Sequence, residues 1–266
     1  MTIKVCVAGA TGWAGSELAR SIAKAPDVVL VAAIARKHAG RILGDVLGEP
    51  RLTARVHASA AEALSEPCDV FVEYTKPDVA KNNILCALER GAHVVVGTSG
   101  LTDDDYAQID ALARKQKRGV LACGNFALTA VLLQKFAEAA ARLIPQWEII
   151  DYAHDDKVDA PSGTVRELTY RLSKVRAPEP TVPIAQTVGP REARGATVSG
   201  SQVHSIRLPG YMISAEAIFG MPDQRLTIRH DSGGSAQPYA EGALLAIRKV
   251  SALVGVHRGL DSVLEL

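Results

Sequence analysis

Several features that mark large protein classes are scarce or missing in this sequence. The 266 residues include only four cysteines, scattered without metal-ligand spacing, so we predict buried free thiols and no metal site. No apolar run is as long as a membrane span, and the first residues lack the pattern of a secretion signal. A net charge of +1 lacks the strong positive balance of a dedicated nucleic-acid binder. We therefore expect a cytoplasmic protein that binds neither membrane nor nucleic acid.

What the sequence does contain is an alternation of apolar runs and helical segments in its first half. The runs are short and rich in β-branched residues, and most are followed by helical periodicity or a helix-start signal. This order is typical of parallel βαβ units. We therefore predict an α/β fold in which residues 1–126 form a Rossmann-like, doubly wound parallel sheet. Its expected strands are Ile3–Ala8, Val28–Ile34, Asp69–Tyr74, His93–Val96 and Gly119–Cys123.

The rhythm changes after Asn125, where helices no longer separate every pair of extended runs. A helix is expected over 129–143 and a strand over 147–153, followed by a proline-rich loop. Two further extended runs, 203–218 and 225–230, have no crossover helix between them, which indicates antiparallel strands. We predict a second α+β domain over 127–235 with a mainly antiparallel sheet. Residues 236–266, which include an amphipathic helix over 239–254, are expected to return to the first domain.

A glycine triplet follows the first expected strand. Gly9, Gly12 and Gly15 stand three apart, and a helical segment begins at once after them. Glycines in this context let the backbone approach a pyrophosphate, whose charge then lies at a helix N-terminus. The spacing is GxxGxxG rather than the stricter GxGxxG, but its place between strand and helix predicts a dinucleotide site.

The end of the second strand indicates which dinucleotide is bound. An acidic residue there would take the ribose hydroxyls of NAD, but this chain has Ala35, Arg36 and Lys37. A guanidinium and an ammonium suit a 2′-phosphate instead. We therefore predict NADPH as the preferred cofactor and NADH as a possible one.

The stretch from His154 to Thr164, HDDKVDAPSGT, carries the most specific signal in the chain. It resembles the substrate loop of the 4-hydroxy-tetrahydrodipicolinate reductases, whose motif there is Glu-x-His-His, two variable residues, then Lys-x-Asp-Ala-Pro-Ser-Gly-Thr. Other segments resemble that family in the same order along the chain. They are the glycine triplet, Tyr74-Thr-Lys-Pro77, Gly97-Thr-Ser-Gly100 and Gly124-Asn-Phe126.

The resemblance implies a fold, a reaction and a set of cofactor contacts. It implies a Rossmann domain joined to an α+β domain, usually assembled as a homotetramer. The reaction it implies is hydride transfer from NAD(P)H to a cyclic unsaturated imine with two carboxylates, in lysine and diaminopimelate biosynthesis. Combined with the glycine loop and the basic pair, it gives the expected cofactor-binding residues: Gly9, Thr11, Gly12, Trp13, Ala14, Arg36, Lys37, Thr75, Gly97, Thr98, Gly124, Asn125 and Phe126.

The substrate loop can also be interpreted from its own chemistry. A dicarboxylate needs cations and aligned donors, and Lys157 offers an ammonium. Residues 162–164 precede a predicted helix, so they present hydroxyls and free backbone N–H groups to an anion, although Ser162 also suits a structural N-cap. The expected substrate-binding residues are His154, Lys157, Ser162, Gly163 and Thr164.

Alanine at position 153 departs from the family motif. Aligning on Lys157 places Ala153 on the first histidine of the family pair, the residue usually proposed as the proton donor, and His154 on the second. We predict Lys157 as the first candidate for proton delivery and His154 as the second. Two alternatives stay open: a related NADPH-dependent imine reductase or amine dehydrogenase with a different substrate, and a non-catalytic cofactor-binding sensor.

Overall fold

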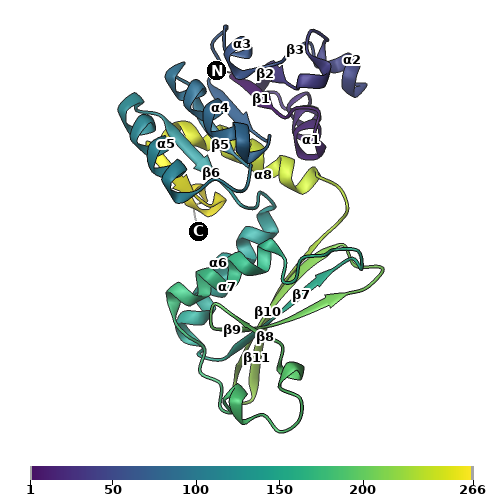
Figure 1. Ribbon diagram of the computed structural model, residues 1–266, viewed down its shortest axis with the longest axis vertical. Coiled ribbons are helices and arrows are strands. Elements are labelled where there is room, and N and C mark those ends of the chain that lie inside the picture. Colours follow the sequence, from purple (N-terminus) through teal and green to yellow (C-terminus); the bar gives the residue numbers. More distant parts are fainter. Residues whose placement is uncertain (1, 265–266) are drawn as a thin grey trace. The chain divides into compact units, whose positions relative to one another are not determined.

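The computed structural model describes residues 2–264, which divide into two compact units. One unit contains the chain up to Leu128 together with the segment that starts at Ala236, and the other is Thr129–Ser235. Figure 1 shows the elements of both units, coloured by their position in the sequence. No helix within residues 2–264 is long and apolar enough to cross a membrane.

The first unit is built on a seven-stranded sheet in the order β12-β6-β5-β4-β1-β2-β3, with every pairing parallel. The strand interiors are buried, as expected for a parallel sheet covered on both faces. Its strands are β1 (Ile3–Ala8), β2 (Val28–Ile34), β3 (Arg55–His57), β4 (Val70–Glu73), β5 (His93–Val96), β6 (Gly119–Ala122) and β12 (Gly255–Arg258).

The helices of the first unit form two groups. α1 (Trp13–Ile22) packs against α8 (Gln237–Lys249), while α4 (Pro77–Glu89) packs against α3 (Ala60–Ala63) and α5 (Asp103–Gln116). The short α2 (Leu43–Leu47) follows β2. Packing of Phe71, Ile84 and Leu88 into one buried cluster joins α4 to the sheet. This arrangement brings the C-terminal helix beside the first helix of the chain (Figure 1).

The second unit has a five-stranded sheet in the order β11-β10-β7-β9-β8, with two helices packed on it. Only the β7–β9 pairing is parallel among the described strands of this sheet. Leu133 and Leu168 of the helices share one buried cluster with Phe219 of the sheet. The elements are α6 (Leu128–Leu143), β7 (Trp147–Ala153), α7 (Gly163–Val175), β8 (Ala196–Val198), β9 (Ser201–Arg207), β10 (Ile213–Met221) and β11 (Gln224–Ser232). The predicted fold class, a doubly wound parallel sheet plus an α+β domain, is confirmed.

Two local predictions were wrong. The extended run expected over 203–218 is two strands, because the Leu-Pro-Gly turn at 208–210 interrupts it. The α-helix expected over 239–254 ends at Lys249; a 3-10 turn (Val250–Ala252) follows, and the chain then forms β12, which pairs with β6. Gly255 adopts a positive φ of 82° just where β12 begins, and a strand of four residues leaves little periodicity to detect.

Candidate cofactor and substrate sites

The glycine loop has a backbone that larger residues could not reproduce. Gly9 has a φ of 79°, and a Cβ atom there would lie 2.4 Å from the Tyr74 carbonyl oxygen. A Cβ atom on Gly15 would lie 2.1 Å from the Gly9 carbonyl oxygen. Both glycines are therefore required by close backbone contacts, which bring the end of β1 against α1 and the turn after β4.

The N-terminus of α1 is suited to an anion. Gly12 is its N-cap, and among the described residues no side chain caps this helix and no acid lies in its first turn. The first N–H groups of a helix have no intrahelical acceptor and carry the positive end of the helix dipole. Trp13 and Ala14 open the helix, and Thr11 lies half-buried in the preceding turn. These residues fit the pyrophosphate of a dinucleotide.

The other predicted cofactor residues also follow the carboxyl ends of parallel strands. Thr75 follows β4, Gly97 and Thr98 follow β5, and Gly124 follows β6. The strand order places β1 between β4 and β2, so the order reverses at β1. Ligands of open α/β sheets bind at such a reversal, outside the carboxyl ends of the strands.

Arg36 and Lys37 lie in a short 3-10 helix (Arg36–His38) directly after β2. Both side chains are exposed, and the neighbouring Gly9 donates its backbone N–H to the Ile34 carbonyl at the end of the same strand. The basic pair thus begins two residues after Ile34, whose carbonyl is bonded to the glycine loop. This position fits the adenosine end of a dinucleotide.

Glu73, which the sequence analysis missed, joins two of these strand ends. Its carboxylate is fully buried at the end of β4 and accepts the Thr75 N–H at 2.6 Å and the Asn83 amide at 2.8 Å. The Thr98 hydroxyl lies 3.4 Å from the same carboxylate and 3.2 Å from the Thr75 carbonyl oxygen. Burial raises the pKa of Glu73 above its usual range, and the hydrogen bonds from Thr75, Asn83 and Thr98 oppose that rise. In the sequence, the only sign of this role is that Glu73 is an acidic residue at the end of an apolar strand.

An aromatic contact links the remaining cofactor segments. The rings of Tyr74 and Phe126 meet edge to face with centroids 5.8 Å apart. A Cβ atom on Gly97 would lie 2.1 Å from the Tyr74 ring, so only glycine fits between these segments. Asn125 accepts the Ala127 N–H at 2.8 Å, which fixes the turn before α6. The loops after β4, β5 and β6 are therefore packed into one surface of the first unit.

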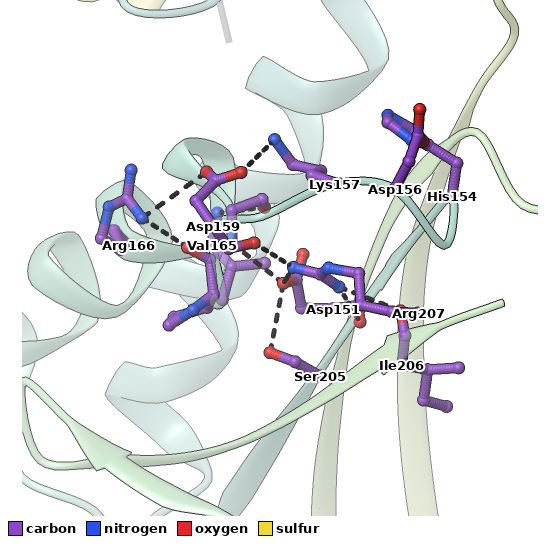
Figure 2. Close-up of polar contacts among 12 residues, drawn as sticks. Asp151, His154, Asp156, Lys157, Asp159, Val165, Arg166, Ser205, Ile206 and Arg207 are labelled. Carbon is purple, nitrogen blue, oxygen red and sulfur yellow. Dashed lines mark hydrogen bonds and ion pairs between the residues drawn. The ribbon is translucent and has the colours of Figure 1, made fainter.

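In the second unit, Lys157 and His154 of the substrate loop contact acids of the same loop. The Lys157 ammonium lies 2.5 Å from the Asp159 carboxylate, and this hydrogen bond holds the pKa of Asp159 below its usual range. The His154 ring contacts the Asp156 carboxylate through Nδ1 and lowers the pKa of that acid. Figure 2 shows both pairs on the segment after β7. Both basic side chains of the loop are thus engaged by carboxylates within the loop.

A buried acid fixes the start of α7. Asp151 of β7 is fully buried and accepts the Ser162 N–H at 2.9 Å and the Arg207 guanidinium at 2.7 Å. Arg207 also donates to the Asp159 carbonyl at 2.7 Å, so one ion pair holds both ends of the Asp159–Ser162 turn (Figure 2). We refer to Asp151 and Arg207 as the loop brace. No local pattern in the sequence predicted this role for either residue.

The Ser-Gly-Thr segment begins α7. Ser162 is buried and is the N-cap, because its hydroxyl accepts the Val165 N–H at 3.4 Å. Gly163 is exposed and Thr164 is half-buried at the first positions of the helix. The Ser162 N–H is not free as expected, because it donates to Asp151, and the Ser162 hydroxyl caps the helix. Substrate binding by Ser162 stays a prediction, and the backbone N–H groups that follow lie at the positive end of the helix.

Ala153 is fully buried as the last residue of β7. It pairs with Arg207 of β9 and Ile213 of β10, and its carbonyl accepts the Leu208 N–H at 3.2 Å. A methyl group has no proton to donate, so any proton must come from another group. Side chains near it along the chain that bear a proton are Tyr152, whose hydroxyl donates to Glu216 at 3.0 Å, and His154 and Lys157 in the loop.

Comparison with known proteins identifies the family. Models named "Dihydrodipicolinate reductase, N-terminus" and "Dihydrodipicolinate reductase, C-terminus" match residues 3–126 and 129–264. The chain belongs to the dihydrodipicolinate reductase family. Its members are NAD(P)H-dependent oxidoreductases, so the predicted family and enzyme class are confirmed.

Individual relatives are similar over their whole length. A 4-hydroxy-tetrahydrodipicolinate reductase from Moorella thermoacetica is 38% identical over 265 residues, which cover 99% of this chain and 98% of that protein. One from Bacillus mycoides is 36% identical over 264 residues, covering 99% of each. The solved structure of a dipicolinate-bound dihydrodipicolinate reductase from Paenisporosarcina sp. TG-14 matches with a TM-score of 0.88 and 31% identity, covering 99% of this chain and 100% of that one.

A more distant structural match shows the fold alone. An amine dehydrogenase from Mycobacterium smegmatis has a TM-score of 0.70 at 18% identity, with 100% of this chain and 97% of that chain covered. The amine dehydrogenase alternative therefore shares the architecture, while the family models and the closer relatives favour the reductase.

Proposed function

We propose that this chain reduces 4-hydroxy-tetrahydrodipicolinate with NADPH in preference to NADH, in lysine and diaminopimelate biosynthesis. The observation that carries this proposal is the substrate loop, in which Lys157 is paired with Asp159 and the start of α7 is held by the loop brace. Lys157 and the N-terminus of α7 both favour anions, and a loop that binds no dicarboxylate would have no physical need to contain both. The family membership of the whole chain supports the same activity.

The residues of the substrate loop suit the two carboxylates of the ligand. The Lys157 ammonium would pair with one carboxylate in place of Asp159, and the N–H groups of Gly163 and Thr164 would meet a carboxylate at the positive end of α7. His154 would act as a further ligand in place of its contact with Asp156. Such bonds orient the imine, which is most of what a protein supplies in hydride transfer.

The cofactor residues suit a dinucleotide in the same way. When bound, NAD(P)H supplies the hydride. The glycine loop and α1 would hold its pyrophosphate, and Arg36 and Lys37 its adenosine phosphate. The loops that contain Thr75, Gly97, Thr98, Gly124, Asn125 and Phe126 would form the surface around its nicotinamide.

The proton for the enamine would come from Lys157 first and His154 second. Lys157, which pairs with Asp159 in the absence of ligand, would deliver a proton from its ammonium to the enamine and then regain one from water. His154 carries the same possibility through its ring nitrogens. The loss of a histidine at position 153 is then compensated within the loop. The homotetramer and the cytoplasmic location stay predictions.

The decisive experiment measures NADPH oxidation with freshly generated 4-hydroxy-tetrahydrodipicolinate. Fast turnover by the wild type is the expected result, with little gain in Ala153→His because another group already supplies the proton. Calorimetric binding of pyridine dicarboxylate in the presence of NADPH would be measured on both proteins. An inactive wild type with an active Ala153→His variant would overturn the proposal and indicate a different imine as the natural substrate. Inactivity of both, without binding of the dicarboxylate, would overturn it as well.

A further inference from the structure

The glycine loop carries an exposed tryptophan. Trp13 is the first residue of α1, directly after the N-cap Gly12, and 62% of it is exposed. The other tryptophan of the chain, Trp147, is buried and donates its indole N–H to Ser201 at 2.9 Å. A large apolar ring left in water at the mouth of a ligand-binding loop is more informative than a scattered surface leucine.

Trp13 is held by a residue from the far end of the chain. Tyr239, in the first turn of α8, places its ring 5.4 Å from the Trp13 ring at an angle of 62°. This is the edge-to-face geometry that aromatic pairs prefer, and α1 packs along α8 behind it. Tyr239 is half-buried, so the contact fixes the indole while most of its surface stays open.

The segment that supplies Tyr239 has no cation. Residues 231–241 read DSGGSAQPYAE, without lysine or arginine. The basic residues assigned to the cofactor, Arg36 and Lys37, follow β2 instead. Among the residues assigned to the cofactor, the two cations are at the adenosine end, whereas an aromatic pair stands beside the helix end that fits the pyrophosphate.

We propose that Trp13 and Tyr239 form an aromatic clamp that contacts the part of the dinucleotide common to NADH and NADPH. Trp13 provides the contact surface, and Tyr239 is a positioning residue that holds the indole. Because the clamp has no charge, its contribution to binding affinity is the same for the two cofactors and does not weaken with salt. The contribution of Arg36, by contrast, favours NADPH and weakens as salt is added. This inference rests on the proposed dinucleotide binding.

The clamp can be tested by fluorescence, without turnover. In a Trp147→Phe protein, Trp13 is the only indole, and titration with NADPH should quench its emission and sensitise that of the dihydronicotinamide. Loss of an aromatic pair contact is worth about 2- to 12-fold in affinity. We expect Tyr239→Ala to weaken NADH and NADPH binding equally, within that range, and Tyr239→Phe to restore both. Arg36→Ala should weaken NADPH binding alone.

Calorimetry separates failure of the clamp from failure of cofactor binding. If the wild type binds NADPH and Trp13→Ala binds both cofactors with unchanged affinity, the clamp is wrong while the cofactor site stands. If the wild type binds neither cofactor, both proposals fail. If Trp147→Phe does not fold, NADPH-induced quenching is measured in the wild type and in Trp13→Phe, and the difference between them gives the Trp13 signal. Melting temperatures then check that Trp13→Phe is folded.

Discussion

The Asp151 carboxylate and the Arg207 guanidinium lie 2.7 Å apart, although 56 residues separate them in the chain. The carboxylate is fully buried, and the same oxygen accepts the Ser162 N–H and the Ser205 hydroxyl. An ion pair of this kind is costly to desolvate, and among the described residues the other Asp151 carboxylate oxygen and Arg207 Nε are buried without a hydrogen-bond partner. Its position explains how a proline-containing turn can present the start of α7 in one geometry.

Asp151→Asn should therefore destabilise the second unit by about 3 kcal/mol, because it leaves the mostly buried Arg207 guanidinium without its counter-charge. Affinity for pyridine dicarboxylate should fall while NADPH affinity, which depends on the first unit, stays the same. Denaturant unfolding and calorimetry would measure the two effects. Asp151→Glu should restore most of the binding. Ser205→Ala, which removes one hydrogen bond from the same oxygen, should cost only about 1 kcal/mol.

The buried Glu73 should make the stability of the protein depend on pH. Its pKa is raised in the folded state above the usual 4.5, so the folded state binds its proton more tightly than the unfolded state does. The resulting stabilisation is present below the ordinary value and is lost as pH rises through the raised pKa. Melting temperatures of wild type and Glu73→Gln should be compared from acid to neutral pH. The melting temperature of the wild type should fall relative to that of the variant as pH rises. A constant difference would contradict this assignment.

Lys157→Ala should remove most of the turnover. The substitution takes away both a cation for a substrate carboxylate and the first candidate for proton delivery, and general acid catalysis alone is worth about 10²- to 10⁴-fold. Steady-state kinetics would measure the loss, with Lys174→Ala as the control, since that lysine packs on the Tyr170 ring at the other end of α7. A Lys157→Ala protein with full activity and normal cofactor binding would rule out this mechanism.

The basic pair after β2 should set the cofactor preference. Replacing Arg36 and Lys37 with alanine removes charge-assisted bonds to a 2′-phosphate, so the Michaelis constant for NADPH should rise about tenfold while that for NADH hardly changes. Lys24→Ala, which removes an exposed charge just beyond the other end of α1, should leave both constants unchanged. A wild-type constant for NADH at or below that for NADPH would contradict the preference.

The sequence by itself determined the features that depend on short stretches of chain. Apolar periodicity predicted the strands from β1 to β6 apart from the three-residue β3, and the spacing of Gly9, Gly12 and Gly15 predicted the loop that opens α1. The substrate loop was also visible, because Lys157 and the residues that begin α7 are nearly contiguous. In each case the backbone geometry or the chemistry is set within a few residues.

Only the tertiary structure decided which distant residues meet. Glu73 reaches Thr98 because β4 and β5 are paired, Asp151 reaches Arg207 because β7 and β9 are paired, and Trp13 meets Tyr239 because α8 packs on α1. Strand register and helix docking depend on the burial of the whole core, so no local pattern predicts them. The sequence thus determined the elements and the reactive groups, whereas packing determined which buried partners hold those groups in place.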